Sequence, residues 1–331
     1  MITGAGLTVG LSFLAVGLYT VLARRTQFMD TPGIRSSHTV PTPTGAGVAL
    51  VASLAVTWPW AGAGSATPGM AAASGPGGYG PLLAGAVCLS LVGLWDDARG
   101  LPARWRLLLQ LLLSTGLAVM LPLPTPWLMP LVVLVLTWTM NAFNFMDGSD
   151  GMAGMQALVS GLMLAFLFHE ANAEGLALVS LGISAAAGGF LPWNWPPARC
   201  FMGDAGSVPL GWLLGGLAVI GLAEGSLTLP AAILVLAVFH VDAGLTLVRR
   251  VWRGERWYTA HRTHVYQMLM AQGRNHGQVL LAYAALNVFI VAPAVVVVAL
   301  KPQWGWAAAF ITFMSLAIAW CVVSLKLGER P

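Results

Sequence analysis

The chain has 331 residues, of which 57% are hydrophobic and only 8% are charged. A soluble globular domain carries about 25% charged residues, so this composition excludes a water-soluble protein and predicts an integral membrane protein. The net charge of +4 could suggest nucleic acid. The placement of the basic residues accounts for it, however, and we expect no nucleic-acid binding. The three cysteines, Cys88, Cys200 and Cys321, show neither a disulfide framework nor zinc spacing.

Apolar segments follow one another along the whole chain. A helix needs about 20 residues to cross a bilayer, with a usual range of about 17–25. Eleven candidate spans, some of them short, lie at about 3–23, 44–60, 80–95, 107–121, 127–146, 152–169, 175–192, 208–223, 226–247, 278–299 and 304–324. The sequence therefore predicts an all-α, polytopic membrane protein with about 11 transmembrane helices, forming one domain over residues 1–331.

Basic residues lie almost entirely on one side of these spans. With the N-terminus outside, 15 of the 16 Lys and Arg residues fall in inside loops, and only Lys301 falls outside. The positive-inside rule then predicts an outside N-terminus and a cytoplasmic C-terminus. The first span lacks a basic segment before it and is followed by Arg24-Arg25, so we expect a retained helix rather than a cleaved signal.

All seven aspartates lie in, or within a few residues of, the predicted inside loops. They are Asp30, Asp96, Asp97, Asp147, Asp150, Asp204 and Asp242. A transporter is expected to place polar groups near the middle of the bilayer, reachable from both faces. The one-sided placement favours instead a cytoplasmic active site, formed by loops at about 24–43, 96–106, 146–151, 193–207 and 248–277. A membrane transporter or flippase for a lipid-linked or sugar substrate is the alternative.

Two of these loops offer carboxylates in pairs. Asp96 and Asp97 could bind a divalent cation or accept a proton, and a plain solvated turn is the alternative. The run NAFNFMDGSDG at 141–151 presents amide and carboxylate oxygens every three residues. Such hard oxygens suit Mg²⁺, which is often held by one or two carboxylates and substrate phosphates. Helix capping by Asp and Asn is the alternative for this run.

Two further segments offer groups for phosphate. Residues 199–212 read RCFMGDAGSVPLGW, and a glycine-rich turn that opens a helix suits an anion, although Ser207 could equally be an ordinary N-cap. The long loop at 249–277, which should contain a short amphipathic helix, carries His261, Arg262 and His264 as a candidate diphosphate pocket. Asp242, about two turns inside its helix, is either functional or simply paired with His240 or an arginine.

Taken in order, five motifs resemble the polyprenyl-phosphate N-acetylhexosamine-1-phosphate transferase superfamily, glycosyltransferase family 4. They are MDTPGIRSSHTVPTPTGAG (29–47), the Asp96-Asp97 loop with Arg106 before LLLQ, NAFNFMDGSDG (141–151), FMGDAGS (201–207) and the late His-bearing loop. The resemblance implies a multi-pass enzyme of the bacterial inner membrane, of EC 2.7.8 type. It would transfer N-acetylhexosamine-1-phosphate from a UDP-sugar to polyprenyl (undecaprenyl) phosphate, giving polyprenyl-diphosphate-sugar and UMP.

The resemblance also implies residue roles. Asp204 and Asn144 would be ligands of Mg²⁺, for which Mn²⁺ could substitute, with Asp147 close to them. Asp96 or Asp97 would be the candidate base. The other implied site residues are His264 in the catalytic group and Arg106, Asp150, Arg262, His38 and Ser207 in substrate binding.

The late loop bears on the subtype. The muramyl-pentapeptide branch of the superfamily has a histidine triplet, whereas this chain reads His264-Val265-Tyr266-Gln267. The pattern favours the branch that initiates O-antigen or other cell-envelope polysaccharides, within lipopolysaccharide synthesis or cell wall biogenesis. The expected partners are a UDP-N-acetyl sugar, polyprenyl phosphate and membrane lipid, and a homodimer is a possible assembly. The CDP-alcohol phosphatidyltransferases are a rival class, but DDARG at 96–100 does not match their aspartate motif.

Overall fold

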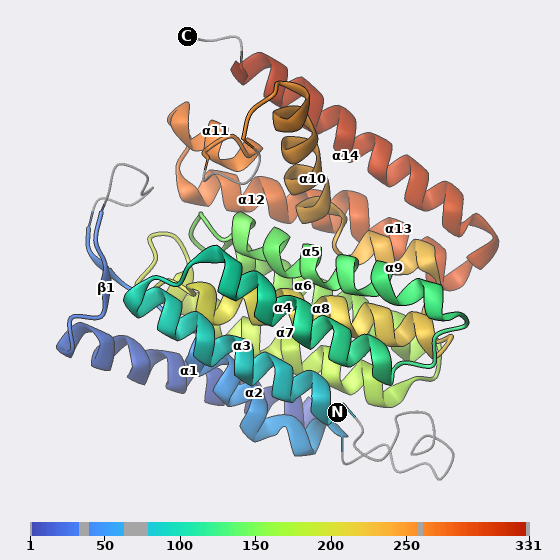
Figure 1. The fold of residues 1–331 in the computed structure, drawn as a ribbon, viewed down its shortest axis with the longest axis horizontal. Helices are drawn as coiled ribbons and strands as arrows, with labels where there is room; N and C mark the ends of the chain where they lie inside the picture. Colours follow the sequence, from blue (N-terminus) through green and yellow to red (C-terminus); the bar gives the residue numbers. More distant parts are fainter. Residues whose placement is uncertain (1, 33–39, 63–78, 257–260, 329–331) are drawn as a thin grey trace.

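The protein is a bundle of helices, most of which run along its longest dimension (Figure 1). The computed structural model describes residues 2–32, 40–62, 79–256 and 261–328. His38, predicted to contact substrate, lies outside these ranges.

The helices follow the order of the predicted apolar segments. The first eight are α1 (Ile2–Arg25), α2 (Gly47–Gly62), α3 (Gly80–Arg99), α4 (Ala103–Met120), α5 (Met129–Met146), α6 (Met152–Glu170), α7 (Glu174–Asn194) and α8 (Asp204–Ala223). The others are α9 (Leu229–Val235), α10 (Ala237–Trp252), α11 (Val265–Ala271), α12 (His276–Leu286), a π-helical turn (Asn287–Val291), α13 (Ala292–Leu300) and α14 (Gly305–Gly328). The 3₁₀ turns Pro126–Leu128 and Pro302–Trp304 precede α5 and α14.

The all-α polytopic fold is confirmed, and all eleven predicted spans are helical. By length and apolar character, however, eight helices in the described ranges could cross a membrane, or nine if the bent pair α9–α10 is one span. The shorter apolar part of α2 (Gly47–Trp58) and the more polar α4 account for the difference from eleven. The predicted span at 226–247 is broken, with α9 and α10 meeting at 77°.

One small strand pair was not predicted. β1 (Met29–Asp30) and β2 (Thr42–Pro43) form an antiparallel ladder just after α1. The chain beyond β2 then runs beside residues 201–202, where Phe201 N–H donates to Pro43 O at 2.7 Å and Ala46 N–H donates to Phe201 O at 3.0 Å. This pairing fixes Asp30 and Thr44 at the end of the bundle where α8 begins.

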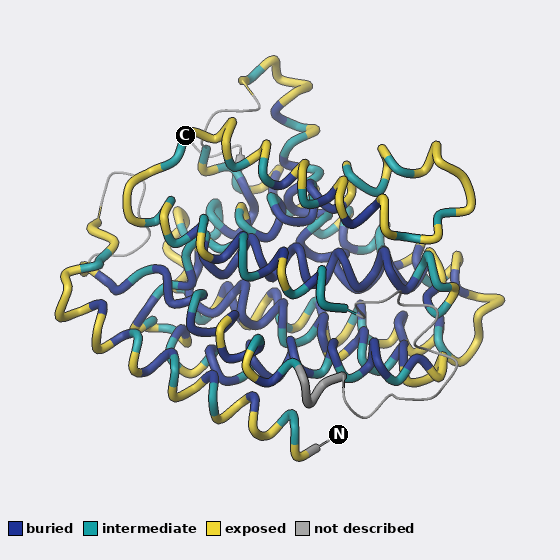
Figure 2. Tube along the Cα trace, turned by 60° about the horizontal axis from the view of Figure 1, so that its bottom comes forward, coloured by how far each residue is buried: buried dark blue, intermediate teal, exposed yellow. Residues whose placement is uncertain are grey.

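Helix α8 is the axis around which the others pack. In its apolar window 94% of the residues are buried, against 28% in α1 and 22% in α14. Figure 2 shows the same gradient, with buried segments in the middle and exposed ones on the outer helices. The first residue of α8, Asp204, therefore lies at the centre of the end of the bundle.

Glycines bring two neighbouring helices onto the start of α8. A Cβ on Gly93 of α3 would lie 2.5 Å from the backbone carbonyl carbon and oxygen of Asp204, and one on Gly47 would lie 2.2 Å from Gly206 Cα. Ser90, one turn before Gly93, donates from its hydroxyl to Ala205 O at 2.7 Å. Asp97, one turn after Gly93, is therefore held beside Asp204.

The close approach of α3 and α8 predicts a cost for one methyl group. Gly93→Ala should lower the free energy of unfolding by about 1–3 kcal/mol, the usual cost of overpacking. The measurement is the thermal unfolding midpoint of the purified protein in detergent.

The matched control is Gly116→Ala in α4, because a Cβ there would meet nothing within 4 Å. Alanine at an open helical position should stabilise by about 0.5–1 kcal/mol. Equal midpoints for the two variants would contradict the proposed contact.

Candidate active site

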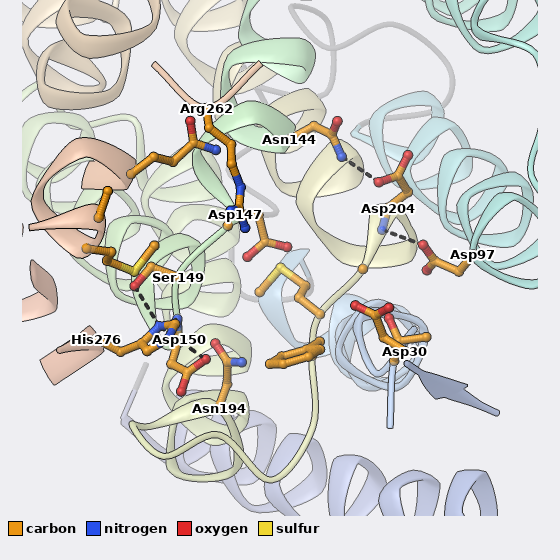
Figure 3. Close-up of a pocket in the computed structure, with 18 of the residues that line it drawn as sticks. Asp30, Asp97, Asn144, Asp147, Ser149, Asp150, Asn194, Asp204, Arg262 and His276 are labelled. Atoms are coloured by element: carbon orange, nitrogen blue, oxygen red, sulfur yellow. Dashed lines mark hydrogen bonds and ion pairs between the residues drawn. The ribbon is translucent and has the colours of Figure 1, made fainter. Parts of the chain in front are cut away.

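A cavity of about 660 Å³ opens at the end of the bundle where α8 begins. Small-molecule sites commonly have volumes of about 300–1,000 Å³. The sequence predicted that five loops form one face of the protein, and each of them contributes residues to the described lining (Figure 3). A few lining residues, such as Thr44 and Asn144, lie directly beside these loops. The charged lining residues are Asp30, Asp97, Asp147, Asp150, Asp204, Arg262 and Arg274.

Asp204 is the centre of this cluster. Asn144, near the end of α5, donates from Nδ2 to Asp204 Oδ1 at 2.6 Å. Arg106, in the first turn of α4, donates from Nη1 to Asp204 Oδ2 at 2.6 Å. The aspartate thus joins α4, α5 and α8, and its two oxygens face different neighbours.

Asp97 caps the first turn of α8. Its carboxylate accepts the backbone N–H groups of Asp204 at 3.1 Å and Ala205 at 3.3 Å, which carry the positive end of the helix dipole. Gly203, with φ +69°, lies against this carboxylate, and a Cβ there would be 2.2 Å from Asp97 Oδ2. The glycine before Asp204 is therefore required by both backbone conformation and contact.

Ser207 does not cap α8, so the N-cap alternative from the sequence was wrong. The helix begins three residues earlier, and the buried Ser207 hydroxyl donates to Gly203 O at 3.1 Å. The same hydroxyl accepts from Asn144 Nδ2 at 3.2 Å. Ser207 therefore supports Asn144 from behind and is not among the residues described as lining the cavity.

The turn after α5 presents Asp147 and Asp150 to the cavity. Burial, followed by the neighbouring carboxylates of Asp204, Asp97 and Asp150, raises the pKa of Asp147 well above its usual value. Asp150 Oδ2 accepts the Ala198 N–H at 2.9 Å, which ties the turn to the loop after α7. An uncompensated carboxylate such as Asp147 is suited to a bound cation.

Asp96 and Arg106 lie on the far side of Asp204. Arg106 Nη1 is 2.8 Å from Asp96 Oδ2, and Asp96 also accepts the Leu101 N–H. Neither residue is described among the lining of the large cavity; Arg106 instead lines a smaller one between α3, α4 and α8. The two adjacent aspartates therefore have different surroundings: Asp97 lines the cavity, and Asp96 forms an ion pair with Arg106.

The late loop contributes Arg262 but not His264 to the described cavity lining. His264 is 3% exposed, with Nδ1 3.7 Å from Asp242 Oδ1. Burial, with His264 and two nearby arginines, lowers the pKa of His261 to about 4, so its ring is neutral near pH 7.

Asp242 is not paired with His240, whose Nε2 lies 3.4 Å from Thr139 Oγ1. The predicted amphipathic helix of this loop is α11.

The sequence analysis gave no site role to several polar lining residues, among them Asn194, Gln267, Arg274 and His276. Arg274 and His276 could have been found as basic groups of the long inside loop and Gln267 from the run at 264–267, whereas nothing distinguished Asn194. Asn194, at the end of α7, accepts the Gly151 N–H at 2.8 Å. His276 Nδ1 lies 3.1 Å from both the Ser149 hydroxyl and the Asp150 backbone nitrogen, so the donated Asp150 N–H leaves the ring proton on Nε2.

The donor set fits Mg²⁺ by its chemistry. The described lining has five carboxylates and two guanidinium groups, a negative excess that a cation would offset. No group of three or more His, Cys, Asp or Glu converges like a metal cage in the described part of the chain. Mg²⁺ needs none, because it keeps waters and binds one or two carboxylates with substrate phosphates. Asp204 and Asn144 could both bind the ion if the Asn144 carboxamide rotated, so that its oxygen and not its nitrogen faced the ion. Which of the two atoms faces inward is assigned from the hydrogen bonds of the amide.

Comparison with known proteins matches one family model to part of the chain. The model of glycosyl transferase family 4 matches residues 80–222. The chain is 29% identical over 248 residues to a "Probable undecaprenyl-phosphate N-acetylglucosaminyl 1-phosphate transferase" of Bacillus subtilis (strain 168), covering 70% of this chain and 68% of the relative. It is 29% identical over 318 residues to a "Decaprenyl-phosphate N-acetylglucosaminephosphotransferase" of Mycobacterium leprae (strain TN), covering 83% and 78%.

A shorter match reaches another branch. A "Phospho-N-acetylmuramoyl-pentapeptide-transferase" of Synechococcus sp. (strain JA-3-3Ab) is 46% identical over 121 residues, which are 36% of this chain and 34% of that protein. The resemblance seen in the sequence is thus confirmed: this multi-pass chain carries a glycosyl transferase family 4 domain, and its relatives are polyprenyl-phosphate hexosamine-1-phosphate transferases.

Proposed function

We propose that the protein transfers an N-acetylhexosamine-1-phosphate from a UDP-sugar to polyprenyl phosphate, with Mg²⁺, at the cytoplasmic face of a bacterial inner membrane. The observation that carries the proposal is the cavity whose described lining holds five carboxylates, Asp204 among them, together with Arg262 and Arg274. A diphosphate would be repelled by the carboxylates alone. The lining therefore suits a cation and an anionic nucleotide bound together.

The reaction exchanges one P–O bond for another. An oxygen of the lipid phosphate attacks the β-phosphorus of the UDP-sugar, a new phosphoanhydride bond forms, and the bond to UMP breaks. A phosphate monoester has a second pKa of about 6, so the attacking oxygen is already largely deprotonated near neutral pH. Proton removal by Asp97 would add little, and positioning and charge neutralisation supply most of the rate.

Each part of the cavity then has a task. Asp204 and Asn144 would hold Mg²⁺ with Asp147 nearby, and the ion would offset charge on the diphosphate. Arg262 and Arg274 donate to phosphate oxygens from the opposite wall, as planar guanidinium groups do. Asp150 and Asn194, both lining the cavity beside the turn at 147–151, lie where a base could be bound.

The sugar is proposed from the relatives. The two relatives described above that match 70% and 83% of this chain are named for N-acetylglucosamine, so UDP-N-acetylglucosamine is the first donor to test. The run His264-Val265-Tyr266-Gln267 supports an initiating role for a cell-envelope polysaccharide such as O-antigen. The relatives favour cell wall polymers instead, and UMP release across a panel of UDP-N-acetyl donors identifies which sugar is transferred.

A transporter or flippase is the competing class. Its substrate path would need polar lining that is reachable from both faces of the membrane. The described lining of the large cavity belongs to the loop end of the bundle, at residues 30, 44, 97, 144, 147–150, 194, 201–204, 262, 267, 270, 271, 274 and 276. That one-sided lining supports an enzyme.

We propose eleven crossings, with α2 and α4 included, the N-terminus outside and the C-terminus in the cytoplasm. The basic residues support this orientation, since Lys301 is the one exception to their inside placement. The start of α1 and the end of α14 lie toward opposite ends of the bundle (Figure 1), as an odd number of crossings requires.

Cysteine labelling tests this topology. In a background without Cys88, Cys200 and Cys321, Gln272→Cys should react with a membrane-impermeant maleimide only after cells are opened. Lys301 is exposed just after the end of α13, on the side predicted to be outside, so Lys301→Cys should react in intact cells. The reverse pattern would reject the cytoplasmic site.

Activity tests the assignment of Asp204 and Asn144. Purified protein with polyprenyl phosphate, Mg²⁺ and a panel of UDP-N-acetyl sugars should release UMP with at least one donor. Asp204→Ala or Asn144→Ala should lower that release at least about 100-fold, as loss of a transition-state charge contact does. Glu224→Gln, at the far end of α8, is the matched control and should keep wild-type turnover. Full activity in either cavity variant would reject the ligand assignment.

Metal binding gives a readout without turnover. A ligand present at one hundred times its Kd stabilises the folded state by about 2.7 kcal/mol. Mg²⁺ should therefore raise the unfolding midpoint of protein treated with chelator, and Asp204→Asn should remove most of that rise. Glu224→Gln should keep it, and an unchanged rise in Asp204→Asn would place the ion elsewhere.

A further inference from the structure

We infer that Asp242 is a positioning residue: together with Arg249 it holds the backbone at 263–265, so that Arg262 and Gln267 face the cavity. The inference rests on the proposed function. It adds which residues position the part of the cavity lining that contains Arg262 and Gln267. Neither Asp242 nor Arg249 is among the residues described as lining the cavity. Both therefore act through the segment that they hold.

The Asp242 carboxylate accepts four hydrogen bonds, three from other helices and one from its own helix α10. Oδ1 accepts the Val265 N–H at 3.1 Å, the Trp320 indole N–H at 3.2 Å and the Thr246 hydroxyl at 3.2 Å. Oδ2 accepts the Tyr283 hydroxyl at 2.5 Å. One side chain of α10, only 3% exposed, thus connects this helix to the first residue of α11, to α12 and to α14.

Arg249 makes a second contact to the same segment. It lies seven residues after Asp242, about two helical turns along the same face of α10. Its Nη2 donates to Thr263 O at 2.6 Å, and its guanidinium lies 5.0 Å from the Trp320 ring centroid. The Asp242 carboxylate therefore accepts the N–H of Val265, while the Arg249 guanidinium donates to the carbonyl of Thr263.

The segment held in this way leads directly into the cavity. Arg262 precedes it and Gln267 follows it, and both line the cavity. Tyr266, between them, donates from its hydroxyl to Phe145 O at 2.9 Å. A Cβ on Gly148 would lie 2.1 Å from that hydroxyl, so Tyr266 packs on the turn that carries Asp147. The hold on 263–265 therefore fixes Arg262 relative to the carboxylates.

The chemistry of Asp242 explains why a buried acid is kept there. A charge within a membrane protein is expensive to bury unless hydrogen-bond donors compensate it. A hydrophobic residue of similar size could fill the space but could not accept the Val265 N–H. Asparagine keeps the volume but loses the negative charge, and with its NH₂ group at the Oδ2 position the Tyr283 hydroxyl would have to accept where it now donates.

The test compares Asp242→Asn with a matched variant, Gln156→Leu. Gln156 is also fully buried in a polar contact, with Asn287, but has no described contact with 263–267. Asp242→Asn should raise the KM for the UDP-sugar about tenfold, the loss expected for hydrogen bonds to a charged group. The KM for polyprenyl phosphate should change no more than in Gln156→Leu. Tyr283→Phe, which removes one donor and keeps the carboxylate, should raise the UDP-sugar KM about threefold and serves if Asp242→Asn fails to fold.

Hydrogen exchange gives a readout that does not depend on turnover. Deuterium uptake by peptides spanning 263–268 should be faster in Asp242→Asn than in wild type, and unchanged in Gln156→Leu. Unchanged uptake in Asp242→Asn overturns the inference, as does faster uptake with an unaltered KM for the UDP-sugar. A wild type that releases no UMP would reject the proposed function alone, since the exchange rates would still decide whether Asp242 holds the segment.

Discussion

The contact between α3 and the start of α8 is the constraint on which the cavity depends. Only a glycine at position 93 lets the two backbones approach so closely, and this approach places the Asp97 carboxylate on the free N–H groups of α8. Asp204 then projects from the same turn toward Asn144 and Arg106. Because α8 is the most buried of the long apolar spans in the described ranges, Asp204 is held at the centre of the bundle, with Asp97 beside it on α3.

Much of this arrangement could be predicted from the sequence. Apolar length gave the helices, and the one-sided placement of basic residues and aspartates indicated which loops share a face. The order of five motifs then singled out Asp97, Asn144, Asp147, Asp150, Asp204 and Arg262, which the structure brings into one cavity. These residues could be found because each rests on local chemistry that survives folding: a carboxylate beside an apolar run stays at the end of a helix.

The rest depends on contacts between distant segments. Asp96 and Asp97 are neighbours in the chain, but helix geometry turns one toward Arg106 and the other toward α8. The motif predicted His264 as a site residue, whereas tertiary packing buries its side chain against Asp242. The break between α9 and α10 has no clear breaker at Leu236; Ser160, on α6, donates to Val235 O at 2.8 Å there. A single sequence carries no sign of such a partner.

The two walls of the cavity differ in what surrounds them. The wall with Asp204 stands on a helix that other helices enclose, while the wall with Arg262 and Arg274 belongs to α10–α14, whose long spans bury only 22–28% of their apolar windows. A change of side chain in α8 disturbs several neighbouring helices at once, whereas most residues in the apolar windows of the last two spans are not buried inside the bundle. Divergence among donor sugars within such a scaffold is therefore expected to accumulate in the last third of the chain, leaving the ion-binding half nearly constant.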